Sequence, residues 1–135
     1  MSYESFVGLT NGAENFVTEK NTALALKSGS LKVLATPEMI RLIETAAADL
    51  LEKKLPPEKT SVGISIDVKH TAPTPVGMKF LVEVKIASVD GRKIIFDALA
   101  FDECSEIGYG CHERFIVKKI SRPMHGFKTR RCNKY

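Results

Sequence analysis

Three polar side chains stand where a purely structural protein would not need them. Thr36 begins a helix-like segment, Glu44 follows eight residues later among apolar residues, and His70 ends a run of alternating apolar residues. A carboxylate, an imidazole and a hydroxyl in one cleft suit acyl transfer, because together they supply a nucleophile or base, a proton carrier and an oxyanion or water donor. The structural alternatives are a helix cap for Thr36, an ion pair for Glu44 and a packed core position for His70.

Thr36 belongs to a segment that is typical of a helix start. Threonine favours the N-cap, and Pro37 suits the first helical position, where its missing N–H is not needed. We therefore expect a helix that begins at Thr36, with the threonine side chain as its cap. It should run to about Lys54, because Pro56 and Pro57 follow.

Glu44 falls on the apolar face of this helix. At 100° per residue, it lies beside the residues that form the apolar stripe, which are Ile40, Ile43, Ala47, Leu50 and Leu51. Burying an unpaired carboxylate costs several kcal/mol. We therefore expect Glu44 to have a partner or to be held protonated.

The rest of the chain predicts an antiparallel sheet. Residues 78–89, 92–101 and 106–120 read as strands, with a hairpin turn at 90–91, a short first strand at 14–20 and a loop or flap at 21–35. A further strand at 62–70 has period-two residues that should share its core-facing side, namely Val62, Ile64, Ile66, Val68 and His70. A helix with one apolar stripe and a sheet with one apolar face should pack together, which predicts an α+β fold.

Composition indicates one globular domain over residues 1–135. The chain is 44% hydrophobic and 27% charged, and no apolar run approaches the ~20 residues of a membrane helix. Three cysteines without framework spacing favour a reducing cytoplasm, and they give no zinc-site pattern. From about residue 118 the chain carries seven basic residues and no acidic one. This tail could be a solvated end or could contact a phosphorylated ligand; we expect neither a nucleic-acid nor a membrane partner.

Two motifs carry a resemblance to a known family. The stretch "VKHTAPTPVGM", together with "EIGYGCHER" and the helix at Thr36, resembles the fluoroacetyl-CoA thioesterase family of the hot-dog fold over about residues 34 to 117. In this motif the prolines after His70 favour extended backbone and should fix the path by which the chain leaves the histidine.

The resemblance implies an architecture and a set of site residues. It implies one long helix wrapped by an antiparallel sheet, and a homodimer with active sites at the interface. The catalytic threonine, glutamate and histidine of the family fall on Thr36, Glu44 and His70, its glycine beside the thioester on Gly63 and its substrate-contacting arginine on Arg114. No metal and no cofactor are implied, since coenzyme A enters as part of the substrate.

The expected function is hydrolysis of a short or modest acyl-CoA thioester to the acid and free CoA. Glu44 would attack the carbonyl or activate water, His70 would move protons, and Thr36 would hydrogen-bond Glu44 or the developing oxyanion. In the family that this chain resembles, a phenylalanine-rich flap before the helix helps to select the fluorinated acyl group. Residues 21–35 here contain no aromatic residue, and Ser30 and Leu31 stand roughly where that aromatic group would be, so we do not expect selectivity for fluoroacetyl-CoA. The alternatives are a non-catalytic hot-dog protein that binds acyl-CoA or a small acid, and a hydratase on the same fold.

Overall fold

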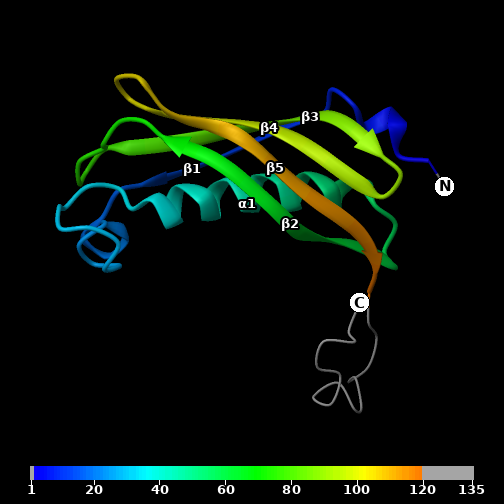
Figure 1. Cartoon of the computed structure of the whole chain (residues 1–135), viewed down its shortest axis with the longest axis horizontal. Helices are drawn as coiled ribbons and strands as arrows, with labels where there is room; N and C mark the ends of the chain where they lie inside the picture. The colour runs from blue at the N-terminus through cyan, green and yellow to red at the C-terminus, as the bar shows by residue number, and fades with distance from the viewer. Residues whose placement is uncertain (1, 120–135) are drawn as a thin grey trace, which may run out of the picture.

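The computed structural model of the protein describes residues 2–119. One long helix, α1 (Thr36–Lys54), lies against a curled antiparallel sheet (Figure 1). Within the described residues the strands are β1 (Thr10–Phe16), β2 (Lys59–His70), β3 (Lys79–Asp90), β4 (Lys93–Asp102) and β5 (Glu106–Lys118). Their order across the sheet is β1-β3-β4-β5-β2, so β2 lies at one edge. The predicted α+β architecture is confirmed, while most of the basic tail, from residue 120, lies outside the described residues.

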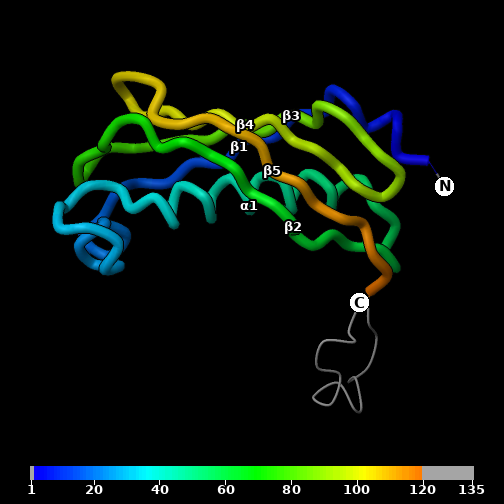
Figure 2. The backbone as a smooth tube through the Cα atoms, in the orientation of Figure 1, coloured from blue at the N-terminus to red at the C-terminus, as the bar shows by residue number. Residues whose placement is uncertain are grey.

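The core forms between the apolar stripe of α1 and the concave face of the sheet, which curves over the helix (Figure 2). The buried helix residues are Met39, Leu42, Ile43, Ala46, Ala47, Leu50 and Leu51. They pack in one core with alternate residues of β3 and β4, of which Phe80, Val82, Val84, Ile86, Ile94 and Phe96 are at most 1% exposed. The apolar stripe of the helix and the apolar face of the strands, both predicted from their periodicity, therefore pack against each other, as expected from the hydrophobic effect.

The start of α1 differs from the prediction in one respect. The N-cap is Ala35, which makes no side-chain cap hydrogen bond, and Thr36 is the first helical residue. The prediction that Thr36 caps the helix is therefore wrong, and its hydroxyl is available for a tertiary contact. The end is as predicted: the helix stops at Lys54, before the two prolines.

The strand β2 contains a bulge that the sequence pattern does not reveal. Gly63 pairs with Arg114 of β5 and Ser65 with Glu113, so that Ile64 is the extra residue between them. The bulge reverses the alternation: Ile66, Val68 and His70 follow the predicted face, whereas Val62 and Ile64 are 45% and 49% exposed. The prediction that Val62 and Ile64 face the core is wrong, and Gly63 takes that orientation toward the helix instead.

The first strand and the flap precede the helix in the chain. The first strand is β1 (Thr10–Phe16) rather than 14–20, because the side chains of Thr18 and Asn21 form a capping box around the short 3₁₀ helix η2 (Glu19–Asn21). The flap, residues 21–35, follows as predicted and is closed at its base by a bridge between Thr22 and Leu34. A first 3₁₀ helix, η1 (Glu4–Phe6), lies before β1.

Candidate active site

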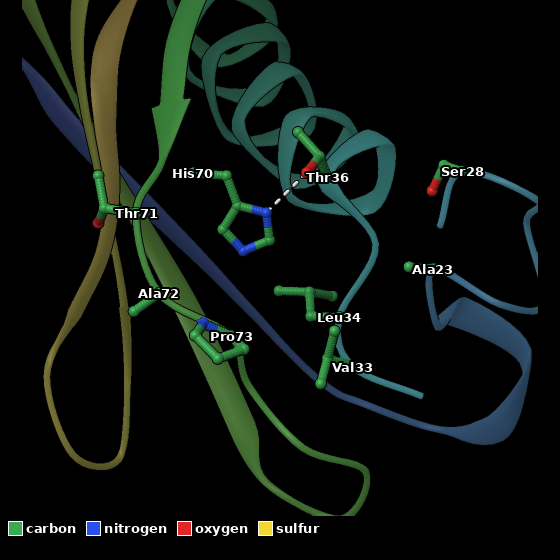
Figure 3. A pocket seen from close by; sticks show the side chains of 9 residues that line it. All are labelled: Ala23, Ser28, Val33, Leu34, Thr36, His70, Thr71, Ala72 and Pro73. Carbon is green, nitrogen blue, oxygen red and sulfur yellow. Dashed lines mark hydrogen bonds between the residues drawn. The ribbon is translucent and has the colours of Figure 1, made fainter. Parts of the chain in front are cut away.

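The hydroxyl of Thr36 and the imidazole of His70 form a hydrogen-bonded pair. Thr36 Oγ1 lies 2.7 Å from His70 Nδ1, although the two residues are 34 positions apart in the chain. The first turn of α1 supplies the threonine and the last residue of β2 supplies the histidine. Figure 3 shows the two side chains turned toward one another, with the second ring nitrogen pointing away from Thr36. The pair therefore joins the helix start to the end of the edge strand.

Thr36 and His70 line a pocket of about 270 Å³. Four residues of the flap form one wall, namely Ala23, Ser28, Val33 and Leu34, and the residues from His70 to Pro73 form the other. None of these residues is Phe, Tyr or Trp, and Ser30 and Leu31 are exposed and do not line the pocket. The pocket therefore has small and aliphatic walls around one imidazole.

His70 Nε2 is buried and has no hydrogen-bond partner among the described residues. A buried polar atom without a partner costs free energy, so a group from a ligand or a second chain would satisfy it. Burial lowers the pKa of His70, an effect that the nearby backbone of Ala72 partly offsets. The ring is therefore neutral near pH 7 and can donate or accept one proton through Nε2, according to its tautomer.

Hydrogen bonds hold the segment after His70 in place on both sides. Thr71 N donates to Ile107 O at 2.7 Å, which continues the pairing with β5 for one more residue. Leu34 N of the flap donates to Thr74 O at 2.8 Å, and the buried Thr74 hydroxyl donates to Asp102 Oδ2 at 2.9 Å. The proline-rich exit is thus anchored to the flap and to β4, and the histidine that precedes it is held in position.

Glu44 belongs to a second group of residues, beside the bulge of β2. A Cβ placed on Gly63 would lie 3.4 Å from Glu44 Oε2, 3.2 Å from Arg114 Nη1 and 3.3 Å from His112 Cε1. The missing side chain of Gly63 therefore leaves a small space that a carboxylate, a guanidinium and an imidazole surround. Glu44 is half-buried, and in residues 2–119 it forms no ion pair.

Arg114 is nearly buried, at 8% exposure, and is held by side chains of the sheet. Its Nε donates to Ser61 Oγ at 2.9 Å and its Nη2 donates to Ser61 O at 3.3 Å, while its Nη1 lies 3.1 Å from His112 Nε2. Burial lowers the pKa of Arg114, and the negative charges of Glu44 and Glu52 oppose that shift. The guanidinium stays charged and supplies a fixed positive group next to Gly63 and Glu44.

Within one chain the predicted residues form two groups rather than one. Thr36 and His70 share the pocket, whereas Glu44, Gly63 and Arg114 meet further along the same seam between α1 and β2. Eight helical residues separate Thr36 from Glu44, which is about 12 Å along the helix axis. The Thr36 hydroxyl contacts His70 and not Glu44 in this chain.

A profile of the fluoroacetyl-CoA-specific thioesterase family matches residues 17–120. The chain belongs to this family. A fluoroacetyl-CoA thioesterase from Streptantibioticus cattleyicolor is 38% identical over 86 residues, which are 64% of this chain and 62% of that protein. The matched part thus spans less than two thirds of that relative's length.

Solved structures agree with the family assignment. A variant of the fluoroacetyl-CoA-specific thioesterase, in complex with fluoroacetate and CoA, superposes with a TM-score of 0.77 at 32% identity, over 82% of this chain and 94% of that one. A hot-dog-like protein from Thermanaerovibrio acidaminovorans superposes with a TM-score of 0.78 at 24% identity, over 84% of each chain. The predicted hot-dog fold is confirmed.

Sequence reasoning missed two residues of the second group. His112 and Ser61 hold Arg114, but their roles depend on which strands pair and on the bulge. The signal for His112 was its place in "HER", two residues before Arg114 and therefore on the same face of a strand. Among residues 2–119, no cluster of His, Cys, Asp and Glu is arranged to hold a metal ion, and no helix is long and apolar enough to cross a membrane.

Proposed function

We propose that this member of the thioesterase family hydrolyses acyl-CoA thioesters, taking up water and releasing the acid and free CoA. The observation that carries the proposal is the Thr36–His70 hydrogen bond. It leaves His70 Nε2 buried, without a partner in the described part of the chain, at a pocket with small polar and aliphatic walls. The reaction needs no resident cofactor, because CoA arrives as part of the substrate. Cys104 and Cys111 form no disulfide within residues 2–119. The expected location is the cytoplasm, since three cysteines without framework spacing are typical of proteins from a reducing compartment.

Each group has a role that its surroundings support. Glu44 attacks the thioester carbonyl or activates the water that does so, and both routes end in the carboxylic acid. His70, oriented by Thr36, relays protons and hydrogen-bonds the sulfur as the C–S bond breaks. Arg114 supplies positive charge close to the acyl end of the substrate, since it is too buried to act as an open phosphate clamp.

The two groups of residues come together in a homodimer. Among residues 2–119, the edge strand β2 has one unpaired side, to which the same strand of a second copy can add in antiparallel orientation. A two-fold axis near Asp67 would place His70 of one copy opposite Gly63 of the other in the antiparallel pairing. Ile64 is skipped in this register because it is the extra residue of the bulge and has no partner. Each active site would then combine Thr36 and His70 from one protomer with Glu44, Gly63 and Arg114 from its partner.

The substrate is a short or modest acyl-CoA without a requirement for fluorine. One named relative is a fluoroacetyl-CoA thioesterase, and the solved variant of the fluoroacetyl-CoA-specific thioesterase binds fluoroacetate and CoA. The pocket here has no aromatic wall, and its flap residues are Ala23, Ser28, Val33 and Leu34. The aliphatic side chains of these walls contact an acyl chain through apolar area, and such contacts discriminate by only about 1–3 kcal/mol for each methylene. We therefore expect a graded preference over several acyl lengths.

The test is a panel of acyl-CoAs of increasing length, with fluoroacetyl-CoA included and the released thiol measured by a chromogenic reagent. Wild-type protein should release thiol from several members, and Glu44→Gln should lose most of this turnover, since such groups contribute roughly 10²–10⁴-fold. Binding of acyl-CoA without thiol release by folded wild-type protein would contradict the proposal and favour a non-catalytic binding protein. Loss of an enoyl chromophore without thiol release would indicate a hydratase.

A further inference from the structure

His112 is a fully buried histidine for which the proposed reaction has no direct use. It is 1% exposed, and its ring packs against Phe96 with the ring centres 6.1 Å apart. Its two nitrogens have different partners: Nδ1 lies 2.7 Å from Ser65 O, and Nε2 lies 3.1 Å from Arg114 Nη1. Both partners belong to the surroundings of the β2 bulge.

These partners determine the tautomer of the ring. A carbonyl oxygen can only accept, so Nδ1 carries a hydrogen and donates it to Ser65 O. A guanidinium can only donate, so Nε2 has no hydrogen and accepts from Arg114 Nη1. The ring must therefore be neutral with its hydrogen on Nδ1, since a second proton would face the positive charge of Arg114.

The same contacts fix the guanidinium of Arg114. Ser61 accepts from Nε and Nη2, and His112 accepts from Nη1, so each of these three nitrogens has a protein partner. One Nη1 hydrogen remains, and Nη1 lies 3.2 Å from the position of a Cβ on Gly63, in the space next to Glu44. That hydrogen is available to an oxygen of a ligand in this space.

We propose that His112 is a positioning residue, which uses Ser65 O as an anchor and Nε2 as an acceptor to direct Arg114 Nη1 into the space beside Gly63 and Glu44. This inference rests on the proposed thioesterase function. Ser61 holds the Nε and Nη2 side of the guanidinium, and His112 adds the contact at Nη1, the nitrogen that borders this space. His112 also spans β5 and β2 across the bulge, so it couples the shape of the bulge to the orientation of the arginine.

The surroundings of His112 shift the pKa of its ring in opposite directions. Burial and Arg114 lower the pKa of the ring, while the Ser65 carbonyl, Glu44 and Glu113 raise it, and the balance lies below the ordinary value. Ile66 of β2 and Phe96 of β4 pair with His112 in the sheet and carry no charge. The neutral ring is therefore the form that occupies this position near pH 7.

The first experiment measures the tautomer in the wild-type protein. A long-range nitrogen–proton correlation spectrum at pH 7, assigned by comparison with His112→Gln, should show His112 neutral with its hydrogen on Nδ1. A hydrogen on Nε2, or a doubly protonated ring, would overturn the proposal, because Arg114 would then have no acceptor. This readout does not depend on activity.

The second experiment compares His112→Gln with His112→Leu. The glutamine amide can donate to Ser65 O and accept from Arg114, so it should keep kcat within about threefold, whereas leucine should lower kcat roughly ten- to a hundredfold through misplacement of Arg114. KM should change less than kcat. Phe96→Leu is the packing control, since it removes the stacked ring but leaves both hydrogen bonds, and it should lower the melting temperature more than kcat.

Three outcomes are decisive. A folded His112→Leu with kcat within twofold of wild type would overturn the inference, and so would an equal loss in His112→Gln and His112→Leu. If His112→Leu does not fold, the tautomer of His112 and the kcat of His112→Gln decide whether the inference stands. A wild-type protein without thioester turnover would instead reject the proposed function, so the two failures are distinguishable.

Discussion

Gly63 leaves open the space toward which the Glu44 carboxylate is directed, since a Cβ there would lie 3.4 Å from Glu44 Oε2. The Arg114 guanidinium borders the same space at 3.2 Å. The bulge in β2 produces this relationship, because it turns Gly63 rather than Val62 toward the helix. A backbone irregularity in an edge strand therefore decides which groups surround Glu44.

The first prediction concerns this space. Gly63→Ala should fold, because the two atoms that its Cβ would crowd, Arg114 Nη1 and His112 Cε1, belong to side chains that can shift by a few tenths of an ångström. It should nevertheless lower kcat roughly tenfold or more, since Arg114 and His112 must move and the added methyl group occupies the space beside Glu44. Gly12→Ala is the matched control: its Cβ would meet Val82 O at 3.2 Å, in a different part of the sheet, and turnover should be retained. Equal effects of the two variants on kcat would contradict the role of Gly63.

The second prediction tests whether the site is shared between protomers. His70→Ala and Glu44→Gln should each lack most activity alone. Mixed under conditions that allow subunit exchange, they should recover about a quarter of wild-type activity, because half of the dimers are then mixed and one of their two sites has both native residues. No recovery, with exchange demonstrated by tagged chains, would mean that each chain builds its own site.

The third prediction concerns the Thr36–His70 hydrogen bond. Thr36→Val keeps the shape of the side chain but removes the hydroxyl that contacts His70 Nδ1. We expect kcat to fall roughly tenfold or more while the melting temperature changes little, because the threonine is exposed and does not cap the helix. Thr36→Ser, which retains a hydroxyl, should stay close to wild type. A Thr36→Val enzyme with normal kcat would show that the hydroxyl is not needed to orient the histidine.

The fourth prediction is a dependence of stability on pH. Burial lowers the pKa of His70 and of His112 in the folded protein. The unfolded chain therefore binds more protons than the folded protein between these lowered values and about 6.5, and the free energy of unfolding must fall as the pH decreases through that window. The slope is at most about 1.4 kcal/mol per pH unit for each histidine.

Urea unfolding between pH 7.5 and pH 5 measures this slope. His70→Gln should show a shallower slope than wild type, because one of the two titrating groups is removed. A stability that rises on acidification below pH 6.5, or a slope unchanged in His70→Gln, would mean that His70 is not held neutral by its surroundings.

The fifth prediction concerns acyl-chain length. Ala23 lines the pocket from the flap, so Ala23→Phe should reduce its volume and shift the preference among acyl-CoAs toward shorter chains. Leu31→Phe introduces an aromatic side chain on the same flap, at a residue that is 66% exposed and does not line the pocket. It should leave the length profile unchanged. A profile that responds to Leu31→Phe and not to Ala23→Phe would place the acyl group elsewhere.

Much of the fold and part of the site could be predicted from the sequence. The end of α1 follows from Pro56 and Pro57, and the side chains that build the core follow from the helical and strand periods. Thr36, Glu44 and His70 stood out because each is polar in a segment whose pattern is otherwise structural, and two of them do lie in one pocket. Their catalytic roles remain predictions.

The rest was decided by tertiary structure. The bulge at Ile64 inserts one residue into a strand whose alternation continues on both sides, so only the pairing of β2 with β5 reveals it. The contact between Thr36 and His70, the group around Gly63 and the hold of His112 on Arg114 all join residues from different elements. The sequence by itself determined which elements form and which side chains could react, since these depend on local spacing. The packing of β2 over α1 determined which of those side chains meet, since distances between elements exist only after the chain has folded.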